Sequence, residues 1–433
     1  MLVEFRLRNY LCFKDEQVLS MVASASDDSL PDNCIAADHG LKRRLLRSAV
    51  IYGPNASGKT KLLDGLNVLN TLVLGSARLQ PDQPLAVTPF LLDQSTSSAP
   101  CEFEVTFIQD DVRYQYGFSA DPQRIWREYL YAAPRGRTVP YFDRQWDPDS
   151  ATEKYTFGPS LRGDNQRMRG LTRSNALFLS VAATFNQPML SQPYVWFARR
   201  LGGVQAPFQL QWALARPTVP KGTYHDKIRQ LLQAADLGID DYRLKRSKRI
   251  SSATDVAASG TEALGHGGPA EDKAALEEQV EVEMLHRASD QSLVPIRLGA
   301  ESNGTIQVFS LSKYLLDALS GGGVLFVDEL NASMHPLLAR EVVRMFHDPE
   351  INKRNAQLIF NTHDTSLLDR GLFRRDQVWL TEKDAQGGAR LRPLLDYRPR
   401  GEEALAKGYL QGRYGAIPEI GDLASIFAES ECP

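Results

Sequence analysis

The sequence reads Gly53-Pro54-Asn55-Ala56-Ser57-Gly58-Lys59-Thr60 directly after a short apolar run at 49–52. This stretch matches the pattern G-x-x-x-x-G-K-[ST] of a phosphate-binding loop, which has a strand before it and a helix after it. The apolar run is suited to a buried strand, and leucine and valine recur at helical spacing across 62–73. The context therefore favours a phosphate-binding loop over a chance glycine-rich turn.

The residue types of this loop suit the phosphates of a nucleotide. Glycines let backbone N–H groups turn toward phosphate oxygens, and the helix N-terminus adds positive potential. We predict that the whole loop from Gly53 to Thr60 binds the nucleotide. Lys59 is predicted to reach the β- and γ-phosphates and to serve catalysis, and the Thr60 hydroxyl is predicted to ligate Mg²⁺.

A second apolar run, at 324–327, ends in Asp328 and Glu329. In open α/β sheets, ligands bind at the carboxyl ends of the strands. Asp328 is therefore predicted to bind the metal, and Glu329 is predicted to polarise an attacking water. Such a run on its own usually marks only a strand that meets a loop, but the phosphate loop in the same chain favours the catalytic interpretation.

A third apolar run leads into Asn361-Thr362-His363-Asp364. A single histidine after a strand is more often structural than catalytic. Here a helical segment separates this strand from the Asp-Glu strand, so the two are expected to be parallel neighbours with their carboxyl ends at one edge. We predict that His363 lies near the γ-phosphate and acts in catalysis.

The stretch Glu301-Ser302-Asn303-Gly304-Thr305 precedes another predicted helix. From the residue types alone it is a helix cap followed by a glycine turn.

The α/β elements lie at both ends of the chain, and the middle interrupts them. We predict that 1–160 carries the phosphate loop and an antiparallel β subdomain with strands in 103–118. Residues 161–290 are predicted to form a mainly helical insertion, with a flexible loop at the Ser-, Ala- and Gly-rich segment 251–272. Residues 291–433 are predicted to complete the nucleotide-binding domain.

Composition indicates a cytoplasmic protein. The formal net charge of −3 argues against bulk attraction to nucleic acid or anionic membrane. The four cysteines share no metal-ligand or disulfide spacing, which favours reduced thiols. The N-terminus alternates like a strand and lacks the apolar core of a signal peptide, and no apolar stretch of about 18 residues is long enough to span a bilayer.

Two short basic runs are candidates for contact with nucleic acid. One comprises 42–44 together with Arg47, and the other is 243–249. Such runs can bind a phosphate backbone, but more often they are solvated faces. We leave both interpretations open from the sequence.

Taken together, these segments resemble the ATP-binding-cassette ATPases of the SMC/RecF-like branch. The resemblance implies an α/β fold with a mixed or parallel central sheet, an antiparallel β subdomain and a helical insertion in place of a coiled coil. It implies ATP and Mg²⁺ as cofactors and a homodimer, or a higher oligomer, with composite ATP sites. Ser302 and Gly304 stand where this branch has its S-G-G-Q signature, although Asn303 and Thr305 depart from it. The segment 331–336 stands where a loop touches the opposing protomer.

Further segments resemble the bacterial ATPases of anti-phage abortive-infection systems, of the AbiL/RloA type or like the PARIS ATPase AriA. They are Pro89-Phe90 and the segments 172–180, 301–305, 375–379 and 409–418. This resemblance implies a subunit that senses infection and controls a separately encoded effector. No nuclease motif is visible, so the effector is expected on another chain, most simply a TOPRIM nuclease.

Two other functions fit the same motifs. One is a RecF-like DNA-repair ATPase that clamps DNA as it dimerises, which the modest basic content disfavours. The other is a nucleotide-gated scaffold with negligible turnover. Salt-dependent, ATP-requiring DNA binding would distinguish the first, and measured turnover would distinguish the second.

Overall fold

The computed structural model describes residues 1–36, 43–134, 136–204, 221–250, 276–399, 404–418 and 421–422. These residues form two compact units, one of Met1–Ala206 with Tyr314–Pro433 and the other of Pro207–Lys313. The flexible loop predicted at 251–272 lies outside the described residues.

The phosphate loop belongs to a six-stranded mixed sheet in the first unit. The strand order is β11-β15-β16-β5-β17-β18, and every neighbouring pair is parallel except the last, which is antiparallel. The strands are β5 (Ser48–Tyr52), β11 (Leu201–Val204), β15 (Val324–Val327), β16 (Gln357–Asn361), β17 (Val378–Lys383) and β18 (Ala389–Pro393).

The three central strands of this sheet are buried along their whole length. Strands covered on both faces read as continuous apolar runs, which is why β5, β15 and β16 could be recognised in the sequence. Because the three are parallel, their carboxyl ends share one edge of the sheet. The phosphate loop, the Asp-Glu pair and the histidine follow these strand ends.

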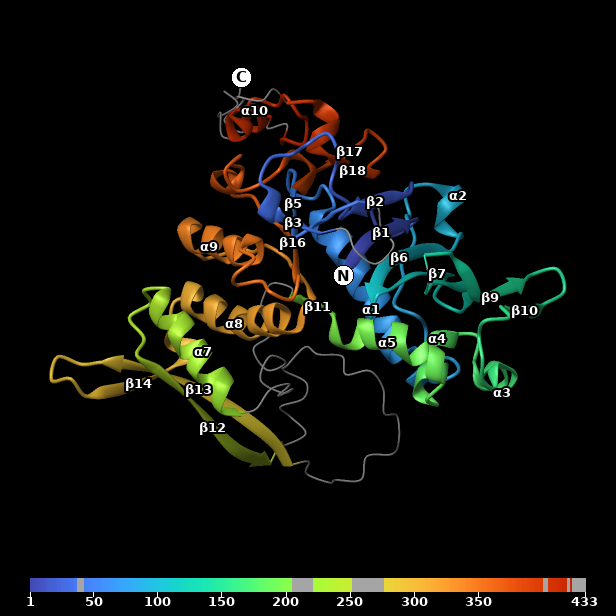
Figure 1. Cartoon of the computed structure of the whole chain (residues 1–433), viewed down its shortest axis with the longest axis horizontal. Coiled ribbons are helices and arrows are strands. Elements are labelled where there is room, and N and C mark those ends of the chain that lie inside the picture. Colours follow the sequence, from blue (N-terminus) through green and yellow to red (C-terminus); the bar gives the residue numbers. More distant parts are fainter. Residues whose placement is uncertain are drawn as a thin grey trace, which may run out of the picture. The chain divides into compact units, whose positions relative to one another are not determined.

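A second sheet of the first unit is antiparallel throughout. Its order is β10-β9-β8-β7-β6-β1-β2, and its later strands follow one another along the chain from blue to green in Figure 1. The strands are β1 (Leu2–Arg8), β2 (Gln17–Ser20), β6 (Cys101–Gln109), β7 (Val112–Ala120), β8 (Ile125–Ala133), β9 (Val139–Asp147) and β10 (Thr152–Phe157). The short strands β3 (Cys34–Ile35) and β4 (Leu45–Leu46) pair separately.

The helix after the phosphate loop, α1 (Lys59–Gly75), joins residues of both sheets in one apolar core. Its leucines at 62, 63, 66 and 69 are fully buried. Gly65 lies so close to β1 that an added Cβ would come within 2.8 Å of Leu7 Cδ2. The helical spacing in the sequence therefore reports a real buried face, and this packing fixes the direction from which α1 approaches the site.

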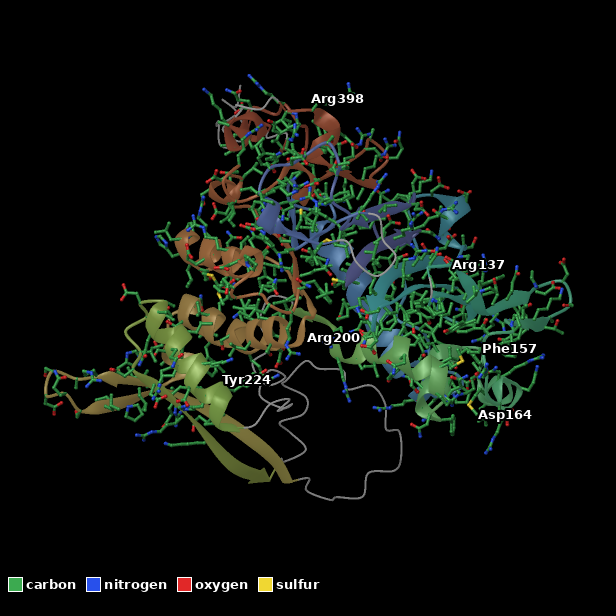
Figure 2. The ribbon with its side chains drawn as sticks, viewed as in Figure 1. Arg137, Phe157, Asp164, Arg200, Tyr224 and Arg398 are labelled. Atoms are coloured by element: carbon green, nitrogen blue, oxygen red, sulfur yellow. The ribbon has the colours of Figure 1, made fainter. Side chains whose placement is uncertain are left out.

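The other helices of the first unit include a group anchored by a buried ion pair. Glu128 accepts hydrogen bonds from the N–H groups of Phe178 and Leu179, and it pairs with Arg144 at 3.7 Å. The Phe178 ring also lies against Phe157, which Figure 2 labels at the end of β10. The helices are α2 (Gln94–Ser97), α3 (Asn165–Leu171), α4 (Phe178–Thr184), α5 (Pro188–Arg199), α9 (Pro336–His347) and α10 (Leu405–Leu410).

The second unit carries helix α7 (Lys221–Ala234), a three-stranded antiparallel sheet and the start of α8 (Asn303–Gly321). The sheet order is β12-β13-β14, with strands Asp241–Ile250, Leu276–Arg287 and Leu293–Arg297. The Tyr242 ring lies between the rings of His225 on α7 and Phe309 on α8. Aromatic contacts therefore join all three parts of this unit.

The α/β fold with a mixed sheet and an antiparallel subdomain is confirmed, but the insertion differs from the prediction. Within the insertion predicted to be mainly helical over 161–290, residues 241–250 and 276–287 instead form the strands β12 and β13. The helices α3, α4 and α5 belong to the first unit. The pairing of β12 with β13 spans a long connection, so no local pattern in the sequence reveals it. Among the described residues, no helix is both long enough and apolar enough to cross a membrane.

Candidate nucleotide site

The phosphate loop leaves β5 and enters α1 through two glycines that other residues could not replace without strain. An added Cβ at Gly53 would lie 2.3 Å from Thr381 Oγ1 and 2.5 Å from the Thr381 carbonyl oxygen. Gly58, the N-cap of α1, has a φ of 106°, which favours glycine. The close approach of β17 to Gly53 and the left-handed turn at Gly58 together determine the backbone conformation of the loop.

Lys59 is a buried cation at the start of α1. It is 6% exposed, and its Nζ donates hydrogen bonds of 2.9 Å to the carbonyl oxygens of Gly53 and Pro54. Burial lowers the pKa of Lys59 to about 8, while the charges of Glu329 and Asp328 oppose that shift. The lysine is therefore mostly protonated at neutral pH and sits in the electrostatic field of both carboxylates.

Asp328 follows β15 directly and is buried beside the phosphate loop. The Thr60 hydroxyl donates a 2.9 Å hydrogen bond to Asp328 Oδ1, although the two residues are 268 positions apart. A hydroxyl and a carboxylate oxygen this close fit Mg²⁺, which prefers oxygen ligands and is usually held by one or two protein groups plus phosphate oxygens. The predicted metal ligands thus lie side by side.

Glu329 is exposed at the same edge and has an unusual backbone conformation. Its φ is +52°, in the left-handed region that residues with a side chain rarely adopt. Its N–H donates a 2.7 Å hydrogen bond to the side-chain oxygen of Asn361. The Asn361 side chain therefore supports the backbone of Glu329 in this conformation.

His363 belongs to the same electrostatic cluster. Burial and the charge of Lys59 lower the pKa of His363, and the two carboxylates of Asp328 and Glu329 act in the opposite sense. The imidazole is therefore largely neutral at neutral pH. The structure thus brings together Lys59, Thr60, Asp328, Glu329 and His363, all from the first unit.

Ser302 and Gly304 lie in the second unit, at the start of α8. The Ser302 hydroxyl accepts a 3.1 Å hydrogen bond from the N–H of Thr305 and lies 2.9 Å from the Thr305 hydroxyl. The helix-cap interpretation of this stretch is therefore confirmed. A role of Ser302 and Gly304 in binding nucleotide stays a prediction.

A pocket of about 430 Å³ lies beside the phosphate loop. Its lining includes Leu91 and Leu92, whose side chains are 65% and 72% exposed, and Cys12 from the turn between β1 and β2. The lining of the pocket thus combines residues of the phosphate loop with apolar side chains. A hollow on the antiparallel sheet is instead lined by charged residues that include the ion pair of Arg6 and Glu104, 3.5 Å apart.

Each basic run contains a cation that has partners within the fold. Arg47 is buried and donates hydrogen bonds to the carbonyl oxygens of Asp32 and Asn352. Lys245 on β12 pairs with Glu283 of β13. In both runs these cations therefore serve the fold, which weighs against the nucleic-acid interpretation. Residue 42 lies outside the described residues.

Three residues of the site were missed by sequence reasoning. Asn361 bonds to both members of the Asp-Glu pair, Thr381 bonds to Ser57 of the loop at 2.6 Å, and the Tyr409 ring packs against Tyr52 just before the loop. Asn361 carried a usable signal, because it is a polar residue that ends an apolar strand just before His363. Thr381 carried none, since only the tertiary fold brings it to the loop, and Tyr409 was singled out only as part of the segment 409–418 by family resemblance.

Residues 48–369 match the model of a family described as "AAA domain, putative AbiEii toxin, Type IV TA system". No protein of curated function matches the chain. Solved structures similar to it include the SMC head domain from Thermotoga maritima, with 10% identity and a TM-score of 0.38 over 90% of this chain and 98% of that chain. The Smc head domain from Pyrococcus furiosus, with an extended coiled coil and bound to the C-terminal domain of ScpA, has 10% identity and a TM-score of 0.39 over 92% and 97%.

Proposed function

The chain belongs to this family of AAA domains, and we propose that it binds and hydrolyses ATP at its phosphate loop. The observation that carries the proposal is the 2.9 Å hydrogen bond from the Thr60 hydroxyl to Asp328. It joins the two protein oxygens that a phosphate-bound Mg²⁺ uses in phosphate-loop enzymes. The neighbouring cation, Lys59, supplies the charge that attracts the phosphates.

Each residue then has a defined task. Lys59 binds the β- and γ-phosphates, and Thr60 and Asp328 hold Mg²⁺, which when bound neutralises charge developing on these phosphates. Glu329 orients a water molecule and accepts its proton as the water oxygen attacks the γ-phosphorus. The bond from that phosphorus to the bridging oxygen breaks, and ADP leaves with the electron pair. The neutral His363 donates a hydrogen bond to the γ-phosphate.

The pocket beside the loop supports a nucleoside as the rest of the ligand. Nucleotide sites combine an apolar surface for the base with a few polar groups that fix orientation. Leu91 and Leu92 provide such an apolar surface next to the loop. We therefore propose that the base of ATP lies on this side of the pocket.

The binding function has a direct test in two lysine variants. Lys59→Ala removes the buried cation and should weaken binding of a fluorescent ATP analogue by at least tenfold, about 1.4 kcal/mol. Lys353→Ala is the matched control, because Lys353 is an exposed lysine that pairs with Glu350. Equal affinities of Lys59→Ala and Lys353→Ala would contradict the proposed site.

We further propose that two copies form composite sites and that the dimer controls a separately encoded effector in anti-phage defence. Ser302 and Gly304 of one copy would contact the nucleotide bound by the other. The family description, with its reference to a toxin–antitoxin system, supports a partner chain. A TOPRIM nuclease is the proposed effector.

The defence role is tested by infection of cells that express the chain alone or with its neighbouring gene. The chain alone should be harmless and give no protection. Co-expression should protect, and Lys59→Ala should abolish that protection. Full protection by the isolated chain would contradict effector control.

A further inference from the structure

The side chain of Asn361 contacts both members of the Asp-Glu pair, Asp328 and Glu329. It is the last residue of β16, which lies between β15 and β5 in the sheet, and its side chain is fully buried. Its backbone is also fixed, because its carbonyl accepts a 3.3 Å hydrogen bond from the N–H of Leu330. The residue is therefore held at the strand end where the Asp-Glu pair begins.

The two ends of the Asn361 amide make different bonds. The side-chain oxygen accepts a 2.7 Å hydrogen bond from the N–H of Glu329, and the side-chain nitrogen donates to Asp328 Oδ1. A backbone N–H can only donate and a carboxylate can only accept, so the partners themselves fix the orientation of the amide. Among side chains of this size, only asparagine offers a donor and an acceptor on one rigid plane.

Both bonds restrain groups that would otherwise be loosely placed. Glu329 has a left-handed backbone, which an L residue rarely holds without outside support. Asp328 Oδ1 takes the Asn361 amide on one side and the Thr60 hydroxyl on the other. The chain of contacts therefore runs from Thr60 through Asp328 and Asn361 to Glu329.

We infer that Asn361 is a positioning residue for hydrolysis, which sets the directions of Asp328 and Glu329 with one amide group. The inference rests on the proposed ATPase function and adds a residue to it. Asn361 does not touch the nucleotide in this account and acts only through the two acidic residues. Loss of the amide should therefore lower the catalytic rate and leave binding of ATP, which depends on Lys59 and the loop, nearly unchanged.

Two substitutions test this inference. Asn361→Asp keeps the size and the acceptor for the Glu329 N–H, but it places a carboxylate where Asp328 needs a donor. Asn361→Ser is a smaller change without added charge, and its hydroxyl is too short to reach both partners. We expect kcat to fall at least tenfold in each variant, while the Kd of a fluorescent ATP analogue changes less than threefold.

A second buried asparagine provides the matched control. Asn352 is 1% exposed, donates to the carbonyl oxygens of Phe346 and Ala356 and accepts from the N–H of Ala356. It closes the turn before β16, at the opposite end of that strand from the site. Asn352→Asp should destabilise the fold in a similar way and retain the wild-type kcat per folded molecule.

The outcomes separate this inference from the proposed function. Glu329→Gln, measured in parallel, should have no turnover. If it has none and both Asn361 variants keep the wild-type kcat, the positioning role is overturned and the ATPase function stands. A loss of kcat in Asn352→Asp equal to that in Asn361→Asp would also overturn it, because general destabilisation would then explain both. A wild-type protein without turnover would overturn the function and the inference together.

Discussion

The charge of Lys59 should change with pH within the range of ordinary assays. Its ammonium group is buried and is bound to two loop carbonyl oxygens. Burial lowers the pKa of Lys59 in the free protein to about 8, from its usual value of 10.5. Phosphates favour the protonated form, so a bound nucleotide should raise this pKa again.

Nucleotide binding should therefore weaken as pH rises through about 8. Below that pH, Lys59 is already protonated and binding involves no proton. Above it, the free protein must take up a proton to bind phosphates, and the affinity should fall by up to about tenfold per pH unit. Calorimetry at pH 8.5 in two buffers of different ionisation enthalpy should report about three-quarters of a proton taken up, since that fraction of Lys59 is deprotonated at this pH. Binding without proton uptake at that pH would contradict the assignment of Lys59 to the phosphates.

Gly53 is a residue whose lack of a side chain shapes the loop. Gly53→Ala would force a Cβ into Thr381, so the loop or β17 must shift. We expect a loss of about 1–3 kcal/mol in the free energy of unfolding, together with weaker ATP binding. Urea denaturation and nucleotide titration measure the two effects. Gly75→Ala is the control, since an added Cβ there meets nothing within 4 Å, and it should leave both quantities nearly unchanged.

At the scale of elements, the C-terminal helix α10 supports the phosphate loop from outside the motif. The Tyr409 ring lies 5.6 Å from the ring of Tyr52, the last residue of β5. Its hydroxyl donates a 3.0 Å hydrogen bond to the Ala416 carbonyl. The segment 409–418, singled out in the sequence only by family resemblance, thus has a structural contact with the strand that leads into the loop.

Tyr409→Phe should keep the ring contact with Tyr52 and remove the hydrogen bond from the hydroxyl to the Ala416 carbonyl. Leaving buried backbone groups unpaired costs about 1–3 kcal/mol, so the melting temperature should fall and ATP binding should weaken with it. Tyr194→Phe is the control, because the Tyr194 hydroxyl bonds only to the Leu74 carbonyl at the far end of α1. If both variants bind ATP equally well, α10 does not support the loop.

What the sequence predicted at this scale was local in the chain. The apolar runs of β5, β15 and β16 and the helical spacing in α1 could be recognised because burial imposes a period on neighbouring residues. The pairing of β12 with β13 could not, since it joins segments that are far apart in the chain. Asn361 and Thr381 were missed for the same reason, because their roles depend on partners that only the folded sheet brings near.

At the scale of the whole molecule, the chain divides its predicted nucleotide contacts between two units. The phosphate loop, Asp328, Glu329 and His363 belong to the first unit, and Ser302 and Gly304 belong to the second. A composite site would then use the first unit of one copy and the second unit of another. In a two-fold dimer each copy would give and receive the same contacts.

Mixing two inactive variants tests this arrangement. Ser302→Arg should block the contact that one copy makes with the nucleotide bound by its partner. Lys59→Ala should remove the nucleotide-binding site of the copy that carries it. Each alone should be inactive, while a mixture under conditions of subunit exchange should recover about one working site per heterodimer. A mixture as inactive as either parent would show that the sites are not shared between copies.

The central claim, hydrolysis of ATP with Glu329 as the residue that activates water, is tested most directly by steady-state phosphate release. Glu329→Gln keeps the size of the side chain and removes its ability to accept a proton. The wild-type protein should release phosphate in a Mg²⁺-dependent reaction, and Glu329→Gln should be at least roughly 100-fold slower with an unchanged Kd for ATP. Release by Glu329→Gln within about twofold of the wild-type rate would contradict the account, since proton acceptance typically contributes far more than that.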